Sequence, residues 1–373
     1  MNNVAQIKDC YGCGVCSIVC AKKLIHIVQD RNGFYTPHIE HQDQCTDCGL
    51  CTKVCAYSHN EVLSSNTTPQ GYAAWSRDTA IRQRCSSGGV SFEIGRSLLN
   101  DGYKLCGVRY DAPSNSATHY IASTVEEWQL SMGSKYIQSY TPDAFKSMNR
   151  KERFLVTGAP CQIDSFRRYL RLFNAEENFV LMDFFCHGVP SKLVWDKYIA
   201  KTEKRIGKVS AVSWRSKERG WHDSWVMTLK GDKPGREHSS PRSQGDAFYL
   251  LFLGNQCLGK ACYAHCKYKG LSSAADIRIG DLWGSTYQTN KEGVSALIGL
   301  TTKGQQVISD TKEIECVSHE INTVIDGQMS HKLSYPFIMR PIQLFLSRTK
   351  VPIAFQAMLS KYINKFKGRL HIQ

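Results

Sequence analysis

Two short stretches near the start of the chain decide its fold. They read "CYGCGVCSIVCAKK" at residues 10–23 and "CTDCGLCTKVCAYS" at residues 45–58. Both contain the spacing C-x-x-C-x-x-C-x-x-x-C, which is formed by Cys10, Cys13, Cys16 and Cys20 and again by Cys45, Cys48, Cys51 and Cys55. This spacing winds a short loop around an inorganic cluster, because three closely spaced thiolates reach three irons of one cubane. The two stretches therefore predict two 4Fe-4S clusters.

The fourth cysteine of each stretch is predicted to bind the other cluster. One ligand set is then Cys10, Cys13, Cys16 and Cys55, and the other is Cys45, Cys48, Cys51 and Cys20. A pair of zinc sites is the alternative, but zinc takes four ligands in separated pairs and needs no third C-x-x-C step. Ala21 and Ala56 stand where a proline commonly follows the fourth cysteine, which is a small departure from the pattern.

The segment between the two stretches predicts a β-hairpin. Residues 24–40, "LIHIVQDRNGFYTPHIE", alternate apolar and polar residues on both sides of Asn32-Gly33, and this dipeptide favours a tight turn. A hairpin between two cluster loops resembles a bacterial dicluster ferredoxin domain. We therefore predict an α+β ferredoxin-like domain over residues 1–65, which we call the head.

The bulk composition fits a soluble globular protein with metal sites. The chain has 373 residues and sixteen cysteines, and no apolar run is long enough to cross a membrane. The start, "MNNVAQIKDC", lacks the apolar region of a signal peptide. Many cysteines in a reducing compartment are more often metal ligands than disulfides. We expect a cytoplasmic protein.

Residues 71–330 predict an α/β body in two parts, 71–150 and 151–330. A glycine loop and an amphipathic helix are expected in "CSSGGVSFEIGRSLLNDG" (85–102), and a strand in "KLCGVRY" (104–110). Two units of strand, loop and helix follow, at residues 153–173 and 178–199. Such units favour a largely parallel sheet with ligand loops at the carboxyl ends of its strands. The loops "GAPCQ" and "CHGVP" would then share one rim.

The body shows neither a dinucleotide-binding G-x-G-x-x-G after a strand nor a Walker loop. Two small-residue loops precede expected helices, namely Ser86-Ser87-Gly88-Gly89 and Gly158-Ala159-Pro160. Helix N-termini offer free N–H groups to phosphate, so both loops are candidate anion sites. The alternative is that these glycines only punctuate the chain.

Seven blocks in order resemble the coenzyme F420 hydrogenase/dehydrogenase beta-subunit family with a fused ferredoxin head. They are "SSGGV" (86–90), "GSKYIQS" (133–139), "GAPCQI" (158–163), "DFFCHGVPS" (183–191), "RSKERGW" (215–221), "CYAHCKYKG" (262–270) and "ADIRIGDLWG" (275–284). Members of this family bind FAD and iron–sulfur clusters and exchange electrons with a small organic acceptor. The resemblance implies FAD in the body, where a flavin converts single electrons into hydride chemistry.

The same resemblance implies a flavin site. Its predicted residues are Ser86, Ser87, Gly88, Gly89, Gly133, Ser134, Lys135, Tyr136, Gly158 and Pro160. Lys135 is the first candidate catalytic residue, because its charge would stabilise an anionic reduced flavin, and Tyr136 would cover the ring. His187 is the second, as a proton donor. The alternatives are a surface lysine and a hydrogen-bonded loop histidine.

A third cluster is a further candidate, with Cys161, Cys186, Cys262 and Cys266 as its ligands. The family usually has C-Y-x-C in the late block, so the spacing here is one residue longer. Buried, inert thiols are the alternative. Cys85, Cys106 and Cys316 are expected to be structural.

The net charge of +14 is unevenly distributed. No acidic residue follows Asp326, while eight lysines and arginines do. Residues 331–373 are thus a basic tail, with an amphipathic helix expected over 354–366. This tail either packs on its own domain, docks an acidic partner or contacts an anionic membrane. Nucleic acid is not expected as a partner, because no recognised motif accompanies the charge.

Two functions follow from the sequence. The first is an iron–sulfur flavoprotein oxidoreductase that passes electrons between two 4Fe-4S clusters and FAD, with hydride transfer to or from an unidentified small molecule. The alternative is an electron-transfer subunit without its own substrate that serves a partner enzyme. Either function requires a redox partner or an electron donor.

Overall fold

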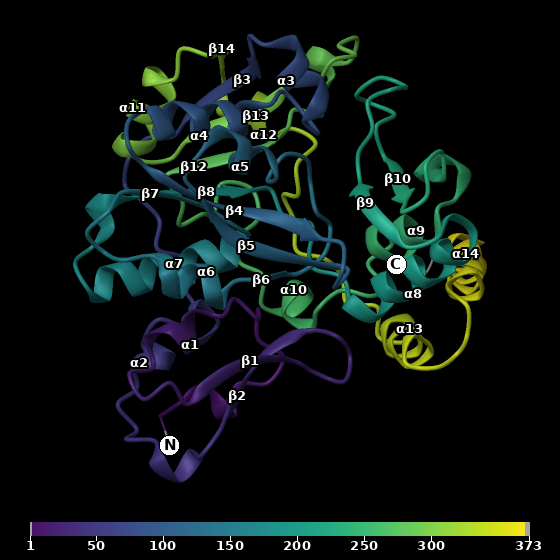
Figure 1. The fold of residues 1–373 in the computed structure, drawn as a ribbon, viewed down its shortest axis with the longest axis horizontal. Helices are drawn as coiled ribbons and strands as arrows, with labels where there is room; N and C mark the ends of the chain where they lie inside the picture. The colour runs from purple at the N-terminus through teal and green to yellow at the C-terminus, as the bar shows by residue number, and fades with distance from the viewer. Residues whose placement is uncertain (1, 370–373) are drawn as a thin grey trace.

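The computed structural model describes residues 2–369 and the side chains up to residue 362. Figure 1 shows three parts: the head at the bottom, a sheet with helices on both faces above it, and a side lobe at the right. The side lobe contains the helices and strands of residues 192–253 and 339–369. None of the helices in the described part of the chain is both long and apolar enough to cross a membrane.

The head contains the predicted hairpin between two short cluster loops. Its elements are η1 Val4–Gln6, α1 Val15–Val19, β1 Ile25–Gln29, β2 Tyr35–Ile39, η2 Gln42–Gln44, α2 Leu50–Lys53 and η3 Ala56–Ser58. β1 and β2 pair antiparallel, and the N–H of Gly33 donates to the Asp30 carbonyl at 2.9 Å to close the turn. Each cluster loop reaches its helix through a glycine at positive φ, Gly14 at 78° and Gly49 at 71°. Only glycine adopts this conformation without strain.

Nine strands form one mixed sheet in the order β14-β3-β13-β12-β8-β7-β4-β5-β6. Their bounds are β3 Gln70–Ser76, β4 Lys104–Asp111, β5 Ser116–Ala122, β6 Ser139–Tyr140, β7 Phe154–Thr157, β8 Phe179–Phe184, β12 Ile277–Asp281, β13 Ser295–Gly299 and β14 Ile314–His319. Four of the eight neighbouring pairs are antiparallel. The expectation of a largely parallel sheet is therefore wrong. β4 returns directly as β5 and β12 as β13, and neither connection contains the crossover helix that parallel strands need.

Helices cover both faces of the sheet. They are α3 Thr79–Arg84, α4 Val90–Asn100, α5 Val125–Gln129, α6 Pro142–Ser147, α7 Pro160–Leu172, α11 Thr302–Asp310 and α12 Ile321–Ile325, with η4 Glu176–Asn178 and η6 Ser285–Tyr287. Leu155 of β7 packs in the cluster that contains α4 and α5 residues, whereas Phe154 and Val156 pack in the cluster that contains α6 and α7 residues. This alternation is the two-residue period of a strand buried on both faces.

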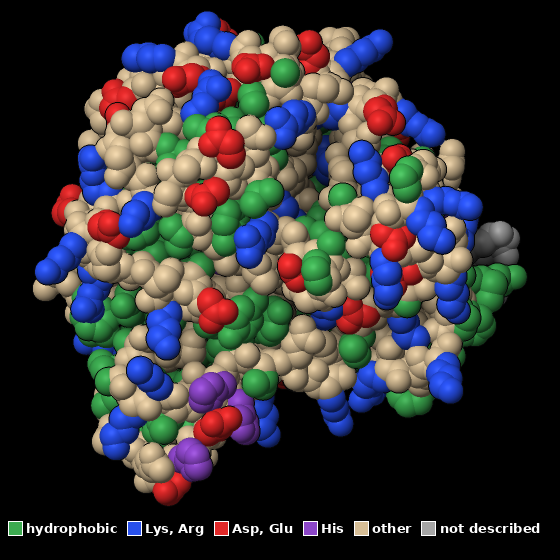
Figure 2. Space-filling model, viewed as in Figure 1, with side chains coloured by type: hydrophobic (Ala, Val, Ile, Leu, Met, Phe, Trp, Pro, Cys, Tyr) green, Lys and Arg blue, Asp and Glu red, His purple; other side chains and the backbone are tan. Residues whose placement is uncertain are grey.

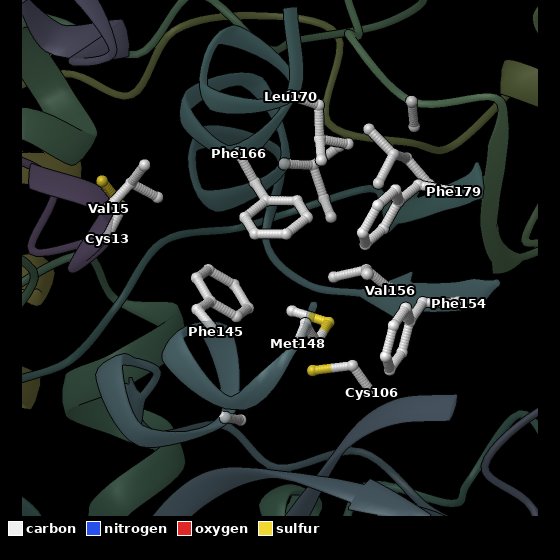
Figure 3. Packing of buried hydrophobic residues seen from close by; sticks show 14 of the residues in the cluster. Cys13, Val15, Cys106, Phe145, Met148, Phe154, Val156, Phe166, Leu170 and Phe179 are labelled. Atoms are coloured by element: carbon white, nitrogen blue, oxygen red, sulfur yellow. The ribbon is translucent and has the colours of Figure 1, made fainter. Parts of the chain in front are cut away.

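The head and the body share one hydrophobic core. Figure 3 shows Phe145 of α6 and Phe166 of α7 facing each other, with Cys13 and Val15 of the head at the same cluster. All four residues are buried, Val15 completely. Since burial of apolar surface is the main force that holds elements together, this core fixes the head on α6 and α7.

The basic tail forms part of the side lobe. The lobe contains α8 Lys192–Ile206, β9 Val209–Ser213, β10 Val226–Gly231, β11 Glu237–Pro241, η5 Arg242–Gln244, α9 Ala247–Leu253, α13 Met339–Ser347 and α14 Ile353–Arg369. Helix α10 Lys260–Ala264 lies beside the head, where Lys260 pairs with Asp9 (Figure 1). The helix expected over 354–366 is confirmed as α14, which lies against α8, α9 and α13. Residues 370–373 of the predicted tail lie outside the described residues. The domain boundaries at 65, 150 and 330 stay predictions.

One edge of the sheet gathers all the predicted ligand loops of the body. β4, β7, β8 and β12 are parallel neighbours, so their carboxyl ends meet there. The loops 158–161 and 185–190 follow β7 and β8, as predicted. Loop 86–89 joins them through the end of β3, because the Ser76 N–H donates to the Gly88 carbonyl at 2.7 Å. Loop 133–136 leads into β6, which begins at this edge.

Candidate redox centres

The first predicted ligand set lines one cavity of the head. Cys10, Cys13, Cys16 and Cys55 surround it together with Val4, Ile7, Tyr11 and Tyr57. Burial raises the pKa of the Cys10 thiol to about 12, and the neighbouring Cys13 and Cys55 raise it further. Four thiolates this close repel one another unless cations neutralise them, so an iron cluster fits this donor set. The arrangement supports the crossed assignment of Cys55, which stays a prediction.

The second predicted set lies farther from the body. Cys48 is exposed, Cys20 and Cys45 are half-buried, and Cys51 is buried. The amide of Asn3 donates to the Cys45 sulfur at 3.5 Å, and such hydrogen bonds to sulfur tune iron–sulfur clusters. A cluster held here would be the outer one, open to an external electron donor.

The inner set touches helix α7 of the body. The Cys13 thiol donates to the Ser165 hydroxyl at 3.2 Å, and the same hydroxyl accepts from the N–H of Ala56 at 3.1 Å. The Thr141 hydroxyl donates to the Cys13 carbonyl at 2.8 Å. Two loops of the head are thereby fixed on α7, which places the inner cluster beside the body.

Four cysteines of the body come together next to this inner set. Cys161 lies in the first turn of α7, Cys186 follows β8, and Cys262 lies in α10, with Cys266 just after it. Burial raises the pKa of Cys161 well above its usual value, and Cys186, Cys13, Cys262 and Cys266 add to the effect in that order. The four thiols are thus near enough to influence one another despite the longer spacing between Cys262 and Cys266. The four thiols fit a third cluster, and the ligand assignment stays a prediction.

Tyr11 is near both the inner thiol set of the head and the four cysteines of the body. Its hydroxyl donates to the His265 carbonyl, and its ring meets those of Tyr57 and Tyr268 edge-on at 5.3 and 5.9 Å. Burial raises the pKa of Tyr11, and Cys161 and Cys266 contribute. Tyr11 therefore lines the cavity of the first set and is also near Cys161.

Two lysines around Tyr268 bind the segments that carry these thiols. The Lys267 ammonium donates to the carbonyls of Ala56, His59 and Glu61 at 2.8–2.9 Å. The Lys269 ammonium donates to the Cys186 carbonyl at 2.8 Å. Sequence reasoning did not assign a role to either lysine. The sequence signal that could have indicated a role is that both lysines lie close to Cys266 in the block "CYAHCKYKG".

The two predicted flavin loops are joined directly. The Ser86 hydroxyl accepts from the N–H of Ser134 at 2.8 Å and from its hydroxyl at 3.1 Å. Gly88 packs so closely that an added Cβ would lie 2.4 Å from the Ala74 carbonyl oxygen. A Cβ on Gly133, in contrast, would meet its nearest neighbour, the Ser86 hydroxyl, only at 4.0 Å. Gly133 is exposed, so the space beside it opens to solvent, and we call this space between the two loops the cradle.

Lys135 is occupied by its own loop. Its ammonium donates to the carbonyls of Leu130, Ser131, Met132 and Gly133 at 2.8–3.2 Å. Burial lowers the pKa of Lys135 to about 7, while four carbonyl dipoles favour the charged form. In this arrangement Lys135 holds the loop that contains Gly133, and its catalytic assignment stays a prediction.

Sequence reasoning missed a buried arginine beneath the loops. Arg215 is fully buried and donates to Asp281 at 3.2 and 3.3 Å and to the Tyr136 hydroxyl at 3.2 Å. Its guanidinium lies over the rings of Trp225 and Trp283 at 4.7 and 5.1 Å. The ion pair of Arg215 and Asp281 joins the segment after β9 to β12. Sequence reasoning missed it because the "RSKERGW" block does not show which of its charged residues is buried.

Lys217, from the same block, supports the first loop. Its ammonium donates to the carbonyls of Arg82, Ser87 and Glu292. Burial lowers the pKa of Lys217 to about 8. The loop 86–89 therefore rests on a buried cation, which favours an anionic ligand there.

His187 lies between the third thiol set and the flavin loops. Its Nε2 faces the Phe252 carbonyl at 3.2 Å, and burial lowers its pKa to about 4. The imidazole is then neutral at pH 7, which does not suit a donor that must start protonated. The Phe252 ring contacts His187 at 5.0 Å and Tyr136 at 5.5 Å between centroids. His187 stays a candidate by position.

The loop with Gly158 and Pro160 has a different neighbour. The N–H of Ala159 donates to the Gln162 side chain at 2.8 Å, which caps the start of α7. The Gln162 amide in turn donates to the Ser139 hydroxyl of β6 at 3.2 Å. This loop thus lies on the same sheet edge, and its N–H groups are partly used within the chain.

The comparisons with known proteins agree with this arrangement. Residues 151–322 match the family described as the C terminus of the coenzyme F420 hydrogenase/dehydrogenase beta subunit, and residues 9–58 match the 4Fe-4S dicluster domain. Residues 151–322 belong to this beta-subunit family. The chain thus joins a 4Fe-4S dicluster domain, which holds two 4Fe-4S clusters, to a segment of an iron–sulfur oxidoreductase family.

The matched segments divide the predicted sites unevenly. The dicluster match contains all eight cysteines of the head, and the beta-subunit match contains the third thiol set, Arg215 and Lys217. The loops 86–89 and 133–136 lie outside both matches.

Two further searches complete the comparison. A chain in a solved structure of the F420-reducing NiFe hydrogenase complex from Methanosarcina barkeri matches with a TM-score of 0.48 and 17% identity. The match covers 70% of this chain and 84% of that chain. No curated protein matches the chain.

Proposed function

We propose that the protein passes electrons between the two clusters of the head and an FAD in the body, with hydride transfer to or from a small organic molecule. The observation that carries this proposal is the sequence of sites along the molecule. The outer thiol set is followed by the inner set, by the four thiols of the body around Cys161, and by the paired loops at Ser86 and Ser134. Tyr11 is near both Cys161 and Cys266, and Phe252 contacts both His187 and Tyr136. We also propose that it acts in the cytoplasm.

The residues of the body would bind and orient the flavin. FAD, when bound, exchanges single electrons with clusters and a hydride with an organic substrate. A planar group is proposed to lie in the open space beside the exposed Gly133, and the buried Lys217 ammonium behind Ser87 favours the negative charge of phosphates or of a reduced ring. Arg215, which is paired with Asp281, donates to the Tyr136 hydroxyl and so restricts the position of the Tyr136 ring.

Filling the cradle should remove the flavin. Gly133→Val places a branched side chain in the open space between the loops, so we expect most of the flavin to be lost while iron content is unchanged. Released flavin is measured by absorbance after denaturation of anaerobically purified protein.

Gly235→Val is the matched control for this experiment. Gly235 also has a positive φ, 72° against 76° for Gly133, and open space around it. Both variants therefore carry a similar backbone strain of about 1–3 kcal/mol. Full flavin in Gly133→Val, or equal loss in both variants, would contradict the proposed site.

The four body thiols are proposed to hold a third 4Fe-4S cluster. Anaerobically purified protein should then contain about twelve irons per chain, and Cys161→Ala should contain about eight. Cys257→Ala is the control, because Cys257 is fully buried and lies in the hydrophobic core of the side lobe. About eight irons in the unaltered protein would reject the third cluster and leave Cys161 as an inert thiol.

An electron-transfer subunit that serves a partner enzyme is the second candidate. The exposed Cys48 at the outer end of the head favours it, as does the net charge of +14, which steers an acidic partner. Reduced protein mixed anaerobically with small acceptors distinguishes the two functions. Turnover without a second protein supports the oxidoreductase, and turnover that requires one supports the subunit.

A further inference from the structure

The exposed apolar side chains of the molecule gather on its C-terminal helices. Eleven large hydrophobic residues among those described are exposed, and six of them lie between residues 337 and 362. These six are 45–80% exposed and form what we call the C-terminal surface: Phe337, Ile338, Phe345, Phe355, Met358 and Tyr362. The other five are distributed over the head and the body. Surface patches of this kind usually mark an interaction site.

Helix α14 has a buried inner face and an apolar outer face. Its inner face buries Ile353, Gln356, Ala357 and Ser360 in the side lobe. Its outer face presents Phe355, Met358 and Tyr362, which recur at the spacing of a single helical stripe. Packing on its own domain, the simpler expectation, explains the inner face only. A helix that faced water would carry polar residues on the outer one.

Cations surround the C-terminal surface, and no acidic residue follows Asp326. Lys332, Arg348, Lys350 and Lys361 of the same part of the chain are exposed, and the Arg348 guanidinium lies 5.8 Å from the centre of the Phe345 ring. In Figure 2, hydrophobic side chains gather at the right edge of the molecule with Lys and Arg next to them. The C-terminal surface therefore combines exposed apolar side chains with positively charged ones.

We propose that the C-terminal surface binds an anionic lipid membrane. Protein interfaces are depleted in lysine, whereas lysines around exposed aromatic residues are typical of helices that lie on acidic lipid. Lysine stems also cover apolar surface while their ammonium groups reach lipid phosphates. The surface is built from α13, α14 and the segment before them, so the proposal does not depend on the redox centres.

Vesicle co-sedimentation of the full-length holoprotein tests this proposal. We expect it to sediment with mixed phosphatidylcholine–phosphatidylserine vesicles, and to remain in solution with phosphatidylcholine alone or at high salt. The triple variant Phe355→Ser, Met358→Ser, Tyr362→Ser should bind about ten-fold more weakly. All three side chains are exposed, so far-UV circular dichroism and iron content should not change.

A matched control replaces exposed apolar residues elsewhere. Val28→Ser with Val317→Ser removes two such side chains from the head and from β14 and should leave vesicle binding as it was. Equal sedimentation of the triple variant and the unaltered protein would overturn the proposal. A second result would also overturn it. If the unaltered protein does not bind vesicles, and sedimentation velocity shows that it is a dimer whereas the triple variant is a monomer, then a second copy of the chain covers the surface.

Discussion

Cys55→Ser should abolish the same cluster as Cys16→Ser, although the two residues lie in different stretches of the chain. Both side chains line the inner cavity of the head, so each substitution removes one of four thiolates from the same cubane. We expect each variant to lose about four irons, whereas Cys20→Ser should lose the outer cluster. Iron content and low-temperature electron paramagnetic resonance of dithionite-reduced, anaerobic protein measure the outcome.

Double variants distinguish this crossed assignment from one in which each stretch binds its own cluster. Cys16→Ser with Cys55→Ser should lose no more iron than either single variant, because both act on one cluster. Cys16→Ser with Cys20→Ser should lose about eight irons. Cys106→Ala, in the body core, controls for the loss of a buried thiol. The reverse pattern would show that each stretch binds its own cluster.

The head could be predicted from the sequence because its determinants are local. The cysteine spacing fixes each loop around one cubane. The predicted hairpin also forms around Asn32-Gly33, although Gln29 pairs with Tyr35, so its turn is one residue longer than a two-residue Asn-Gly turn. Helix α4 likewise ends at Asn100, just before Gly102, where the sequence indicated. In each case residues a few positions apart decide the conformation.

The sheet and the buried charges depend on distant residues and could not be predicted in the same way. The strand direction of β13 follows from a connection without a crossover helix. Arg215 and Asp281 are 66 residues apart and meet only because β12 ends beside the segment after β9. Lys135 was expected near a flavin, and the carbonyls that bind it come from the turn after α5. The shared rim of Cys161 and Cys186 was predictable, because parallel neighbouring strands end together.

Arg278→Met should lower the free energy of unfolding strongly. Arg278 and Asp183 are fully buried on neighbouring strands β12 and β8 and pair through two hydrogen bonds of 2.7 and 2.8 Å. Ser273 donates to the same carboxylate at 2.7 Å. Loss of the guanidinium leaves a buried charge without its counter-ion, which costs about 3–5 kcal/mol. Urea unfolding under anaerobic conditions, followed by circular dichroism, measures this change in the free energy of unfolding.

Two further variants test whether the unpaired buried charge itself causes this loss of stability. Asp183→Leu with Arg278→Met removes both charges and should recover most of the loss, because an apolar pair of similar volume replaces a buried ion pair at little cost. Lys104→Met breaks the half-exposed pair with Glu152, at 2.7 Å, and should cost less than about 1 kcal/mol.

Arg278 also donates to the Gly270 carbonyl, at the end of the segment that contains Cys266 and Lys269. Arg278→Met should therefore lower the iron of the third site even where the fold persists, and full iron in a folded Arg278→Met protein would show that this site does not depend on the pair.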